Sequence, residues 1–352
     1  MKHWLEKFTL VVTEKPDAAA RIAAALDYCG QPKRIVEKGV PFFQVSRDRK
    51  IVVVSALGHL YTVTGDPRER GRYPAFGLKW VPKYEAERGA MRIRVWINVI
   101  SKLSKQADQL IDACDYDIEG SIIGYSILKY ACHNREKIAK RMKYSTLTKE
   151  ELEKSFKTLS PHLDFDLIEA GLARHEIDWL YGINLSRALS YATKNFMGKY
   201  TTLSTGRVQG PTLKFLALRE RTIRCFVPVP FWSIKAKIII GITTFEVTHE
   251  KKVIERKQQA QALTDICKQK FGAIINVQEE KIVHPPPVAF DLGSLQKEAY
   301  KIFRCTPTHT LSIAQKLYLD ALISYPRTSS QKLPPQIGYE KILKKLAENS
   351  QY

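Results

Sequence analysis

Short runs of β-branched and apolar residues alternate with a helical pattern along the first part of the chain. Residues 8–13 and 51–55 are two such runs, typical of buried strands, and a third lies at about 109–114. Residues 18–26 have the apolar spacing of a helix, and Pro16 before them suits its first turn. Strands that alternate with helices predict an α/β domain with a mostly parallel sheet.

The pattern changes several times after the second strand. Residues 68–105 are charged and contain Pro74 and Pro82, just after Pro67, which predicts mostly loop within the first domain. Helical apolar spacing follows the α/β domain, then β-branched residues around 231–247, then a polyproline break at Pro285 and further helices. The predicted parts are an α/β domain at 1–150, a helical segment at 151–203, a hinge and β-rich segment at 204–282, and a partial helical domain at 283–352.

The 352 residues carry a large positive charge. Lys and Arg number 56 against 36 Asp and Glu, a formal net charge of +20, while 44% of the residues are hydrophobic. The hydrophobic fraction predicts a folded chain rather than a disordered one. The charge favours a polyanionic partner, with nucleic acid ahead of a membrane surface. The alternative is a soluble basic protein without such a partner.

Six cysteines lie far apart in the sequence. Their spacing offers neither a C-x-x-C pair for zinc nor a dense disulfide framework, which indicates reduced thiols. The N-terminus lacks an apolar core of signal-peptide length, and no run approaches the roughly 18 apolar residues of a membrane span. We therefore expect a soluble, cytoplasmic protein.

The first candidate for chemistry is the acidic sequence after the third strand. Asp115, Asp117 and Glu119 alternate there, so an extended backbone would direct all three carboxylates to one side, with Gly120 opening a helix. Clustered carboxylates suit Mg²⁺. The spacing shares the opening of an EF-hand loop, but Ser126 stands where that loop needs a glutamate. The alternative is a solvated acidic turn that caps the helix.

Glu14 and Lys15 directly follow the first strand. Because the carboxyl ends of parallel strands meet at one edge of a sheet, both could share a site with Asp115. A carboxylate there is a candidate general acid or base and a lysine can bind phosphate, although a Glu-Lys pair at a turn commonly just faces solvent. The chain has no G-x-x-x-x-G-K-[ST] sequence, which gives no support to nucleotide hydrolysis through a P-loop.

A third candidate is Tyr325, in the octapeptide at residues 323–330. A tyrosine followed two residues later by Arg327 and then by hydroxyl groups is chemically suggestive. Tyrosine is a poor nucleophile at its ordinary pKa of about 10 and needs cationic help from an arginine or a metal. The alternative is a packing tyrosine before a turn.

Six further polar residues are candidates for contacts with phosphate. A helical group presents two arginines that could face a nucleic-acid backbone, although a solvated, salt-bridged face is the more common explanation. A stretch with two glycines and a proline follows and is typical of a hinge. The six residues are Arg174, Asp178, Ser186 and Arg187 in the helical group and Arg207 and Gln209 in the hinge.

Taken in order, these motifs resemble the type IA DNA topoisomerases, and most of all their archaeal branch. The resemblance runs through nearly the whole chain, and the ordered set is highly specific although each piece is weak alone. The pieces are Val12-Thr13-Glu14-Lys15-Pro16, Gly58-His59-Leu60, Asp115 to Gly120, Ala173-Arg174 with Asp178, Gly182 and Ser186-Arg187, Gly206-Arg207-Val208-Gln209 with Pro211-Thr212-Leu213, Pro285-Pro286-Pro287 with Phe290-Asp291-Leu292 and Leu295-Gln296, Ala314-Gln315 with Leu317-Tyr318, and Ile323 to Thr328.

The resemblance implies a Toprim domain, a metal-dependent phosphoryl-transfer module, over the first 150 residues. Tyr325 would attack a phosphodiester of single-stranded DNA and form a 5′-phosphotyrosine link, without ATP because one ester replaces another. Glu14 would handle the proton of the 3′-oxygen, and Lys15 and Arg327 would stabilise charge on the phosphate. The complete enzyme would relax negative supercoils. The implied Mg²⁺ ligands are Asp115, Asp117, Glu119 and Glu14, and the implied DNA contacts are the six residues above with Thr328.

The chain departs from the family in two ways. Ile118 and Ser121 stand where many members have Arg and Glu in the acidic motif. Only residues 326–352 follow the tyrosine, without the family's downstream histidine motif or C-terminal zinc fingers. We therefore expect a fragment, or half of a split enzyme, that a missing C-terminal portion completes. The alternatives are another Toprim phosphotransferase, such as a nuclease or primase, and a DNA-binding fragment without catalysis.

Overall fold

The computed structural model divides into two compact units. The residues that it describes are 7–69, 71–268, 270–333 and 337–348. The first unit joins Met1–Arg207 to Pro287–Tyr352, and the second is Val208–Pro286. The bounds of the second unit lie close to those of the predicted hinge and β-rich segment at 204–282. The helical segment predicted separately at 151–203 lies in the same compact unit as the sheet.

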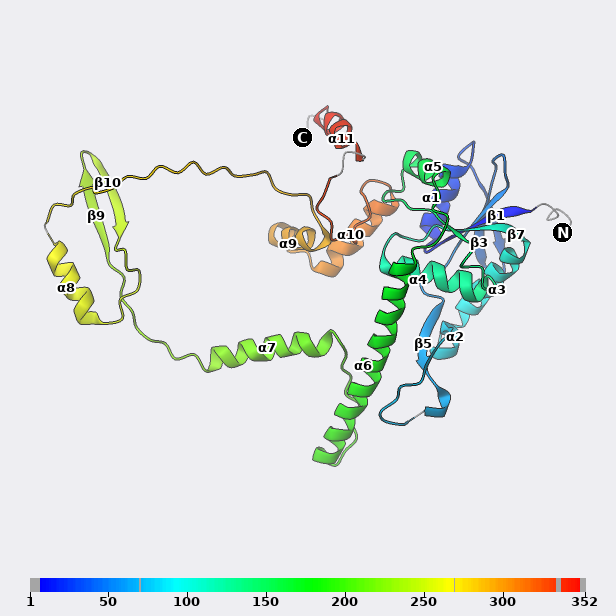
Figure 1. Ribbon diagram of the computed structural model, residues 1–352, viewed down its shortest axis with the longest axis horizontal. Helices are drawn as coiled ribbons and strands as arrows, with labels where there is room; N and C mark the ends of the chain where they lie inside the picture. Colours follow the sequence, from blue (N-terminus) through cyan, green and yellow to red (C-terminus); the bar gives the residue numbers. More distant parts are fainter. Residues whose placement is uncertain (1–6, 70, 269, 334–336, 349–352) are drawn as a thin grey trace. The chain divides into compact units, whose positions relative to one another are not determined.

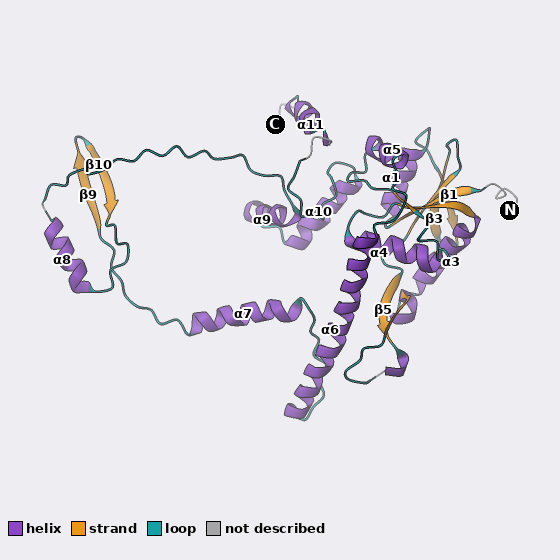
Figure 2. Ribbon diagram, viewed as in Figure 1, coloured by secondary structure: helices purple, strands orange, loops and turns teal. Residues whose placement is uncertain are grey.

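A six-stranded mixed sheet forms the centre of the first unit (Figures 1 and 2). Its strands lie in the order β2 (Lys33–Glu37), β3 (Val40–Val45), β4 (Ile51–Ser55), β1 (Phe8–Thr13), β7 (Ala107–Asp112) and β8 (Lys140–Arg141). Strands β4, β1, β7 and β8 are parallel, which confirms the predicted α/β fold class. The β2–β3 hairpin adds an antiparallel edge that the residue pattern did not predict.

Helices cover both faces of this sheet, and its central strands β1 and β4 are therefore buried along their whole length. Neighbouring residues of β1 belong to different cores because side chains alternate along a strand. Leu10 packs in the core that includes α3 (Met91–Gln106) and α4 (Ile118–Ser126), and Val11 in the core that includes α1 (Pro16–Leu26). The proline that opens α1 occupies its first turn, as predicted.

Helix α3 corrects the prediction of mostly loop at residues 68–105. Its buried apolar residues are Trp96, Val99, Ile100 and Leu103, which recur at helical spacing. Four charged residues, Arg92, Arg94, Lys102 and Lys105, interrupt this pattern in the sequence. The same region also contains η1 (Pro67–Glu69), β6 (Leu78–Pro82) and α2 (Lys83–Ala86). Strand β6 pairs with β5 (Tyr61–Gly65) in a separate two-stranded sheet.

The acidic sequence leads into α4 and then a π-helical turn, Ile127–Ala131, so helical structure ends close to the predicted Tyr130. Helices α5 (Lys149–Lys157) and α6 (Phe165–Met197) follow. None of the helices in the described ranges is both long and apolar enough to cross a membrane.

The second unit contains α7 (Gln209–Arg224), the antiparallel pair β9 (Lys235–Ile240) and β10 (Thr243–Thr248), and α8 (Lys257–Cys267). The strands match the predicted β-rich segment. Helix α7 begins within the stretch predicted as a hinge, and Pro211 lies in its first turn, where proline is tolerated. The chain then returns to the first unit as α9 (Leu292–Phe303), α10 (Pro307–Leu319) and α11 (Tyr339–Ala347).

Two glycines of α6 give a matched test of how it packs. A Cβ at Gly171 would lie 2.3 Å from Cδ1 of Ile122 in α4, whereas a Cβ at Gly182 would meet no atom within 4 Å. We expect Gly171→Ala to lower the free energy of unfolding by about 1–3 kcal/mol through overpacking. Gly182→Ala should raise it by up to about 1 kcal/mol through helix propensity. Urea denaturation measures both, and changes of the same sign would contradict the packing of α6 on α4.

Candidate active site

The acidic residues lie where the chain turns from β7 into α4. Strand β7 ends at Asp112, and Asp117 is the N-cap of α4, with Oδ1 accepting a hydrogen bond of 2.7 Å from the Gly120 N–H. Asp115 is buried in the loop between them, and Glu119 lies in the first helical turn. The three carboxylates therefore do not alternate on an extended strand, and the expectation that one strand end directs them to one side is wrong.

A buried arginine fixes the backbone of this loop. Arg141, only 1% exposed, donates hydrogen bonds to the carbonyl oxygens of Asp112, Cys114 and Asp115 at 3.2, 2.8 and 3.0 Å. Its guanidinium also lies 3.5 Å from the Asp112 carboxylate. The loop that presents Asp115 is thus held by a cation from β8. Sequence reasoning missed Arg141, since an isolated arginine in a charged stretch gives no sign of being buried.

Gly120 allows the loop to fold closely against the start of α4. A Cβ at this position would lie 2.2 Å from the carbonyl oxygen of Asp115. That neighbour is backbone and cannot move aside as a flexible side chain could. The glycine that ends the acidic motif is therefore required by the close approach of helix and loop.

Glu14 and Lys15 meet Asp115 at the carboxyl edge of the parallel strands. Lys15 Nζ donates to Asp115 Oδ2 at 2.7 Å and lies 3.0 Å from Glu14 Oε1. Burial, followed by the charge of Asp115, raises the pKa of Glu14 above its ordinary value. Burial lowers the pKa of Lys15, but the Asp115 and Glu14 carboxylates outweigh it and raise that pKa. The structure thus brings together the residues that the strand-end argument grouped.

Tyr325 lies against the same loop. Its backbone N–H donates to the Ser145 carbonyl at 2.8 Å, and its Oη donates to Asp117 Oδ2 at 2.5 Å. The side chain is 9% exposed. Burial, followed by the charges of Asp115 and Asp117, raises the pKa of this phenol well above its ordinary value. The hydroxyl therefore remains protonated in this arrangement and points its proton at a carboxylate.

A second tyrosine supports the first. Tyr318 of α10 is 1% exposed and donates from Oη to Asp115 Oδ1 at 3.3 Å. Its ring meets the ring of Tyr325 edge to face, with centroids 5.2 Å apart. Tyr318 belongs to a sequence piece that carried the family resemblance, but it was not predicted as a site residue.

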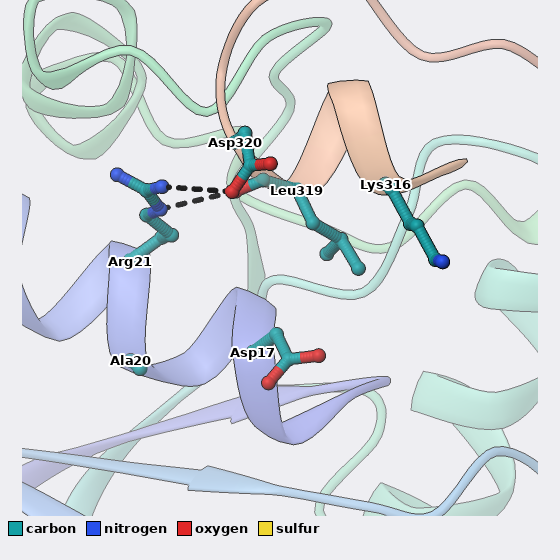
Figure 3. Close-up of a pocket in the computed structure, with 6 residues that line it drawn as sticks. All are labelled: Asp17, Ala20, Arg21, Lys316, Leu319 and Asp320. Atoms are coloured by element: carbon teal, nitrogen blue, oxygen red, sulfur yellow. Dashed lines mark hydrogen bonds and ion pairs between the residues drawn. The ribbon is translucent and has the colours of Figure 1, made fainter. Parts of the chain in front are cut away.

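Helix α10 contacts α1 beside this tyrosine pair. Arg21 of α1 donates from Nε to the Leu319 carbonyl at 3.0 Å, and its Nη2 lies 3.4 Å from Asp320 Oδ1 (Figure 3). A shallow pocket between the two helices is lined by Asp17, Ala20, Arg21, Lys316, Leu319 and Asp320. This contact holds the end of α10 against α1, the helix that directly follows Glu14 and Lys15.

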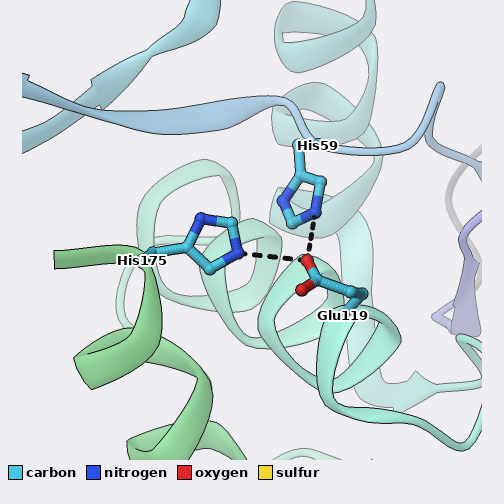
Figure 4. Close-up of side chains that lie close together, drawn as sticks. All are labelled: His59, Glu119 and His175. Atoms are coloured by element: carbon cyan, nitrogen blue, oxygen red, sulfur yellow. Dashed lines mark hydrogen bonds and ion pairs between the residues drawn. The ribbon is translucent and has the colours of Figure 1, made fainter. Parts of the chain in front are cut away.

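Glu119 has a different set of partners. His59 Nε2 and His175 Nε2 lie 2.9 and 3.0 Å from its Oε2, and Arg174 Nη1 lies 3.2 Å from its Oε1 (Figure 4). Hydrogen bonds from the two histidines hold the pKa of Glu119 well below its usual range. Neither histidine was predicted as a site residue. Only the Gly58-His59-Leu60 piece drew attention to one of them.

The predicted phosphate contacts are mostly engaged with other protein groups. Arg207 Nε donates to Asp178 Oδ1 at 2.5 Å, and Arg174 Nε lies 3.9 Å from Asp178 Oδ2. Arg187 Nη1 donates to the Arg72 carbonyl at 2.5 Å. These pairs connect α6 to the loop that follows it and to the backbone at Arg72, as expected for a salt-bridged face.

The remaining predicted residues fall into two groups. Ser186 Oγ donates to the Thr205 carbonyl at 3.1 Å, which ties α6 to the loop after it. Arg327 and Gln209 are exposed, and Thr328 is half-buried, with its carbonyl accepting from the Leu292 N–H at 3.1 Å. Of the whole predicted set, Glu14, Lys15, Asp115, Asp117 and Tyr325 therefore form one connected cluster.

Comparison with known families matches two parts of the chain. A family described as Toprim domain matches residues 9–147, and one described as DNA topoisomerase matches residues 162–352. A Toprim domain is a metal-binding domain.

Curated relatives and a solved structure extend the comparison. DNA topoisomerase 1 of Pyrococcus horikoshii is 44% identical over 347 residues, which are 97% of this chain and 50% of that protein. The Methanocaldococcus jannaschii DNA topoisomerase 1 is 44% identical over 94% of this chain and 42% of its own, and DNA topoisomerase 3 of Staphylococcus haemolyticus is 32% identical over 92% and 44%. The chain thus spans about half the length of these relatives.

Full-length topoisomerase I from Thermotoga maritima shares the fold, with a TM-score of 0.63 at 23% identity over 94% of this chain and 51% of that one. The two family matches together cover most of the sequence, in the order in which its motifs occur. The chain therefore belongs to the type IA DNA topoisomerases.

Proposed function

We propose that this chain carries the strand-cleaving centre of its family, in which Tyr325 attacks a phosphodiester of single-stranded DNA. The observation that carries the proposal is the hydrogen bond from Tyr325 Oη to Asp117. It joins a tyrosine to the acidic loop 208 positions earlier in the chain. A tyrosine that only packs in the core would not be expected beside Asp117, Lys15 and the buried Asp115.

The donor set of this cluster fits Mg²⁺. Glu14, Asp115 and Asp117 offer hard oxygen ligands, and burial, followed by the charge of Asp115, raises the pKa of Glu14. They do not present three ligand atoms as a ready-made group in the described structure. Mg²⁺ needs only one or two carboxylates, with waters and substrate phosphate completing its shell. When bound, it would neutralise charge on the scissile phosphate. Glu119, which the resemblance also implies as a ligand, is engaged by His59 and His175.

The proposed cleavage step exchanges one phosphate ester for another. Tyr325 Oη bonds to phosphorus while the bond to the 3′-oxygen breaks. Asp117 is placed to take the phenolic proton, and Glu14, whose raised pKa favours its protonated form, supplies a proton to the 3′-oxygen. Lys15 and the exposed Arg327 stabilise the charge on the phosphate. The reverse step rejoins the strand, and no ATP is consumed.

Further DNA contacts are proposed from the predicted residues. Gln209 and Arg327 are exposed and can meet phosphate directly. Arg174, Asp178, Arg187 and Arg207 are engaged with protein groups, so DNA would have to exchange with those partners. Ser186 and Thr328 complete the proposed set. We propose that the complete enzyme relaxes negative supercoils in the cytoplasm.

A trapping experiment tests the proposal. A short single strand labelled at its 3′ end is incubated with the chain and Mg²⁺, and denaturant is then added. We expect label to remain covalently attached to the protein, because the 5′-phosphate of the downstream fragment is linked to tyrosine. Free cut ends without an adduct would indicate a nuclease, and retention without cutting would indicate a binding protein.

Plasmid relaxation separates cleavage from strand passage. We propose that strand passage needs the half of the family's length that this chain does not span. This 352-residue chain alone should therefore form the adduct but fail to relax negatively supercoiled plasmid with Mg²⁺. Adding a segment that supplies the remaining half should restore relaxation. Efficient relaxation by this chain alone would disprove the requirement.

A further inference from the structure

Two imidazoles converge on one carboxylate oxygen beside the cluster described above. His59 Nε2 and His175 Nε2 lie 2.9 and 3.0 Å from Glu119 Oε2, and the three ligand atoms lie within 4.8 Å of one another (Figure 4). Ligands at about 2.0–2.1 Å from a tetrahedral zinc ion are separated by about 3.3 Å. Small side-chain adjustments would therefore let one ion contact all three atoms.

We propose that His59, Glu119 and His175 form a site for a divalent transition-metal ion of the zinc class, distinct from the Mg²⁺ ligands. Two imidazoles with one carboxylate are a donor set that suits zinc, cobalt and related ions. The Glu14, Asp115 and Asp117 cluster offers only oxygen atoms, which suit Mg²⁺. Ligand chemistry thus separates the two ions.

The three ligands come from three separate elements. His59 follows β4, Glu119 lies in the first turn of α4, and His175 lies in α6. Within the described ranges, no other set of three His, Cys, Asp or Glu residues places its ligand atoms this close. A bound ion would therefore cross-link α4, α6 and the segment after β4.

Neighbouring groups hold these ligands in position. Arg174 Nη1 lies 3.2 Å from Glu119 Oε1, which leaves Oε2 for the ion, and the charge of Arg174 is partly offset by Asp178 at 3.9 Å. The Trp80 ring packs 5.8 Å from the His175 ring and donates from Nε1 to Glu176 at 3.1 Å. Such supporting contacts are typical around metal ligands.

The site is open to solvent on one side. The side chains of His59, Glu119 and His175 are 26%, 27% and 28% exposed. An ion can therefore enter without unfolding the chain. Three protein ligands with a remaining position for water are the arrangement that zinc adopts at open sites.

The test measures cobalt binding without DNA. Cys29, Cys225, Cys267 and Cys305 are replaced by serine in the parent protein, because accessible thiols also bind these metals. Co²⁺ is then titrated, and its visible absorption reports tetrahedral coordination. We expect one equivalent to bind, to be displaced by Zn²⁺ and to resist excess Mg²⁺.

Single substitutions assign the site. His59→Ala and His175→Ala should each weaken Co²⁺ binding at least about tenfold, and Glu119→Gln should do so while keeping the shape of the side chain. The matched control is His162→Ala, since His162 is exposed and lies outside the cluster. It should bind as the parent does. Circular dichroism establishes that each variant is folded, and Glu119→Gln serves if a histidine variant is not.

The result that overturns the proposal is equally plain. The proposal is wrong if Co²⁺ does not bind stoichiometrically to the parent protein. It is also wrong if the His59, Glu119 and His175 variants keep the parent affinity for Co²⁺, or if His162→Ala loses as much affinity as they do. Two histidines that merely donate hydrogen bonds to Glu119 would give the first of these. The measurement needs no DNA, so failure of the proposed strand cleavage leaves it unaffected.

Discussion

Replacing Tyr325 with phenylalanine is expected to abolish the covalent adduct with single-stranded DNA and to leave DNA binding nearly unchanged. Phenylalanine keeps the buried ring and its edge-to-face contact with Tyr318. It removes only Oη and the hydrogen bond to Asp117, which is half-exposed and can be solvated. The fold should therefore persist while the atom that bonds to phosphorus is lost. A denaturing gel with labelled DNA measures the adduct, and filter retention measures binding.

The neighbouring tyrosine provides the control. Tyr318→Phe makes the same chemical change 5.2 Å away and removes the hydrogen bond to Asp115 instead. We expect this variant to form the adduct still, at a reduced rate because Asp115 is less firmly held. An adduct at the parent level from Tyr325→Phe would exclude Tyr325 as the nucleophile. If only Tyr318→Phe lost the adduct, Tyr318 would take its place.

Replacing Arg141 with methionine should lower the free energy of unfolding by about 3–5 kcal/mol, because it leaves a buried carboxylate uncompensated. Methionine fills much of the volume but donates no hydrogen bond. The carbonyl oxygens of Asp112, Cys114 and Asp115 would lose their common donor, and the Asp112 carboxylate, 1% exposed, would lose its cation. Urea denaturation followed by circular dichroism measures the change.

Arg34→Met is the matched control for this substitution. Arg34 is exposed on β2, so the same change should alter the free energy of unfolding by no more than about 0.5 kcal/mol. If both variants proved equally stable, the buried guanidinium would not be what holds the acidic loop. An adduct assay on folded Arg141→Met should show weakened cleavage as well, since Asp115 depends on the same backbone.

The parts of the fold that could be predicted are those with a local signal. The strands at 8–13 and 51–55 are continuous apolar runs, and their bounds match β1 and β4. Helix α3 was missed because Arg92, Arg94, Lys102 and Lys105 interrupt its apolar pattern. The β2–β3 hairpin was missed because β2 is largely exposed and has no clear alternation.

The site divides in the same way. Parallel strand order places Lys15 beside Asp115, and this could be predicted from the strand ends alone. The hydrogen-bond partners of Glu119 could not be predicted in this way. They depend on the start of α4 at Ile118, which turns the Glu119 carboxylate toward His59 and His175. These partners come from segments on either side of it in the sequence, and no spacing rule connects them.

The burial of two cysteines makes the thiols of this chain chemically unequal. Burial raises the pKa of Cys132 to about 11 and that of Cys114, beside the acidic loop, well above its ordinary value, so neither forms a reactive thiolate near neutral pH. Cys29, Cys225 and Cys267 are exposed. With the half-exposed Cys305 replaced by serine, maleimide dyes should label the first unit at Cys29 and the second at Cys225 or Cys267 without modifying the site. Energy transfer between such dyes could then follow the separation of the two units while a DNA strand is bound and released.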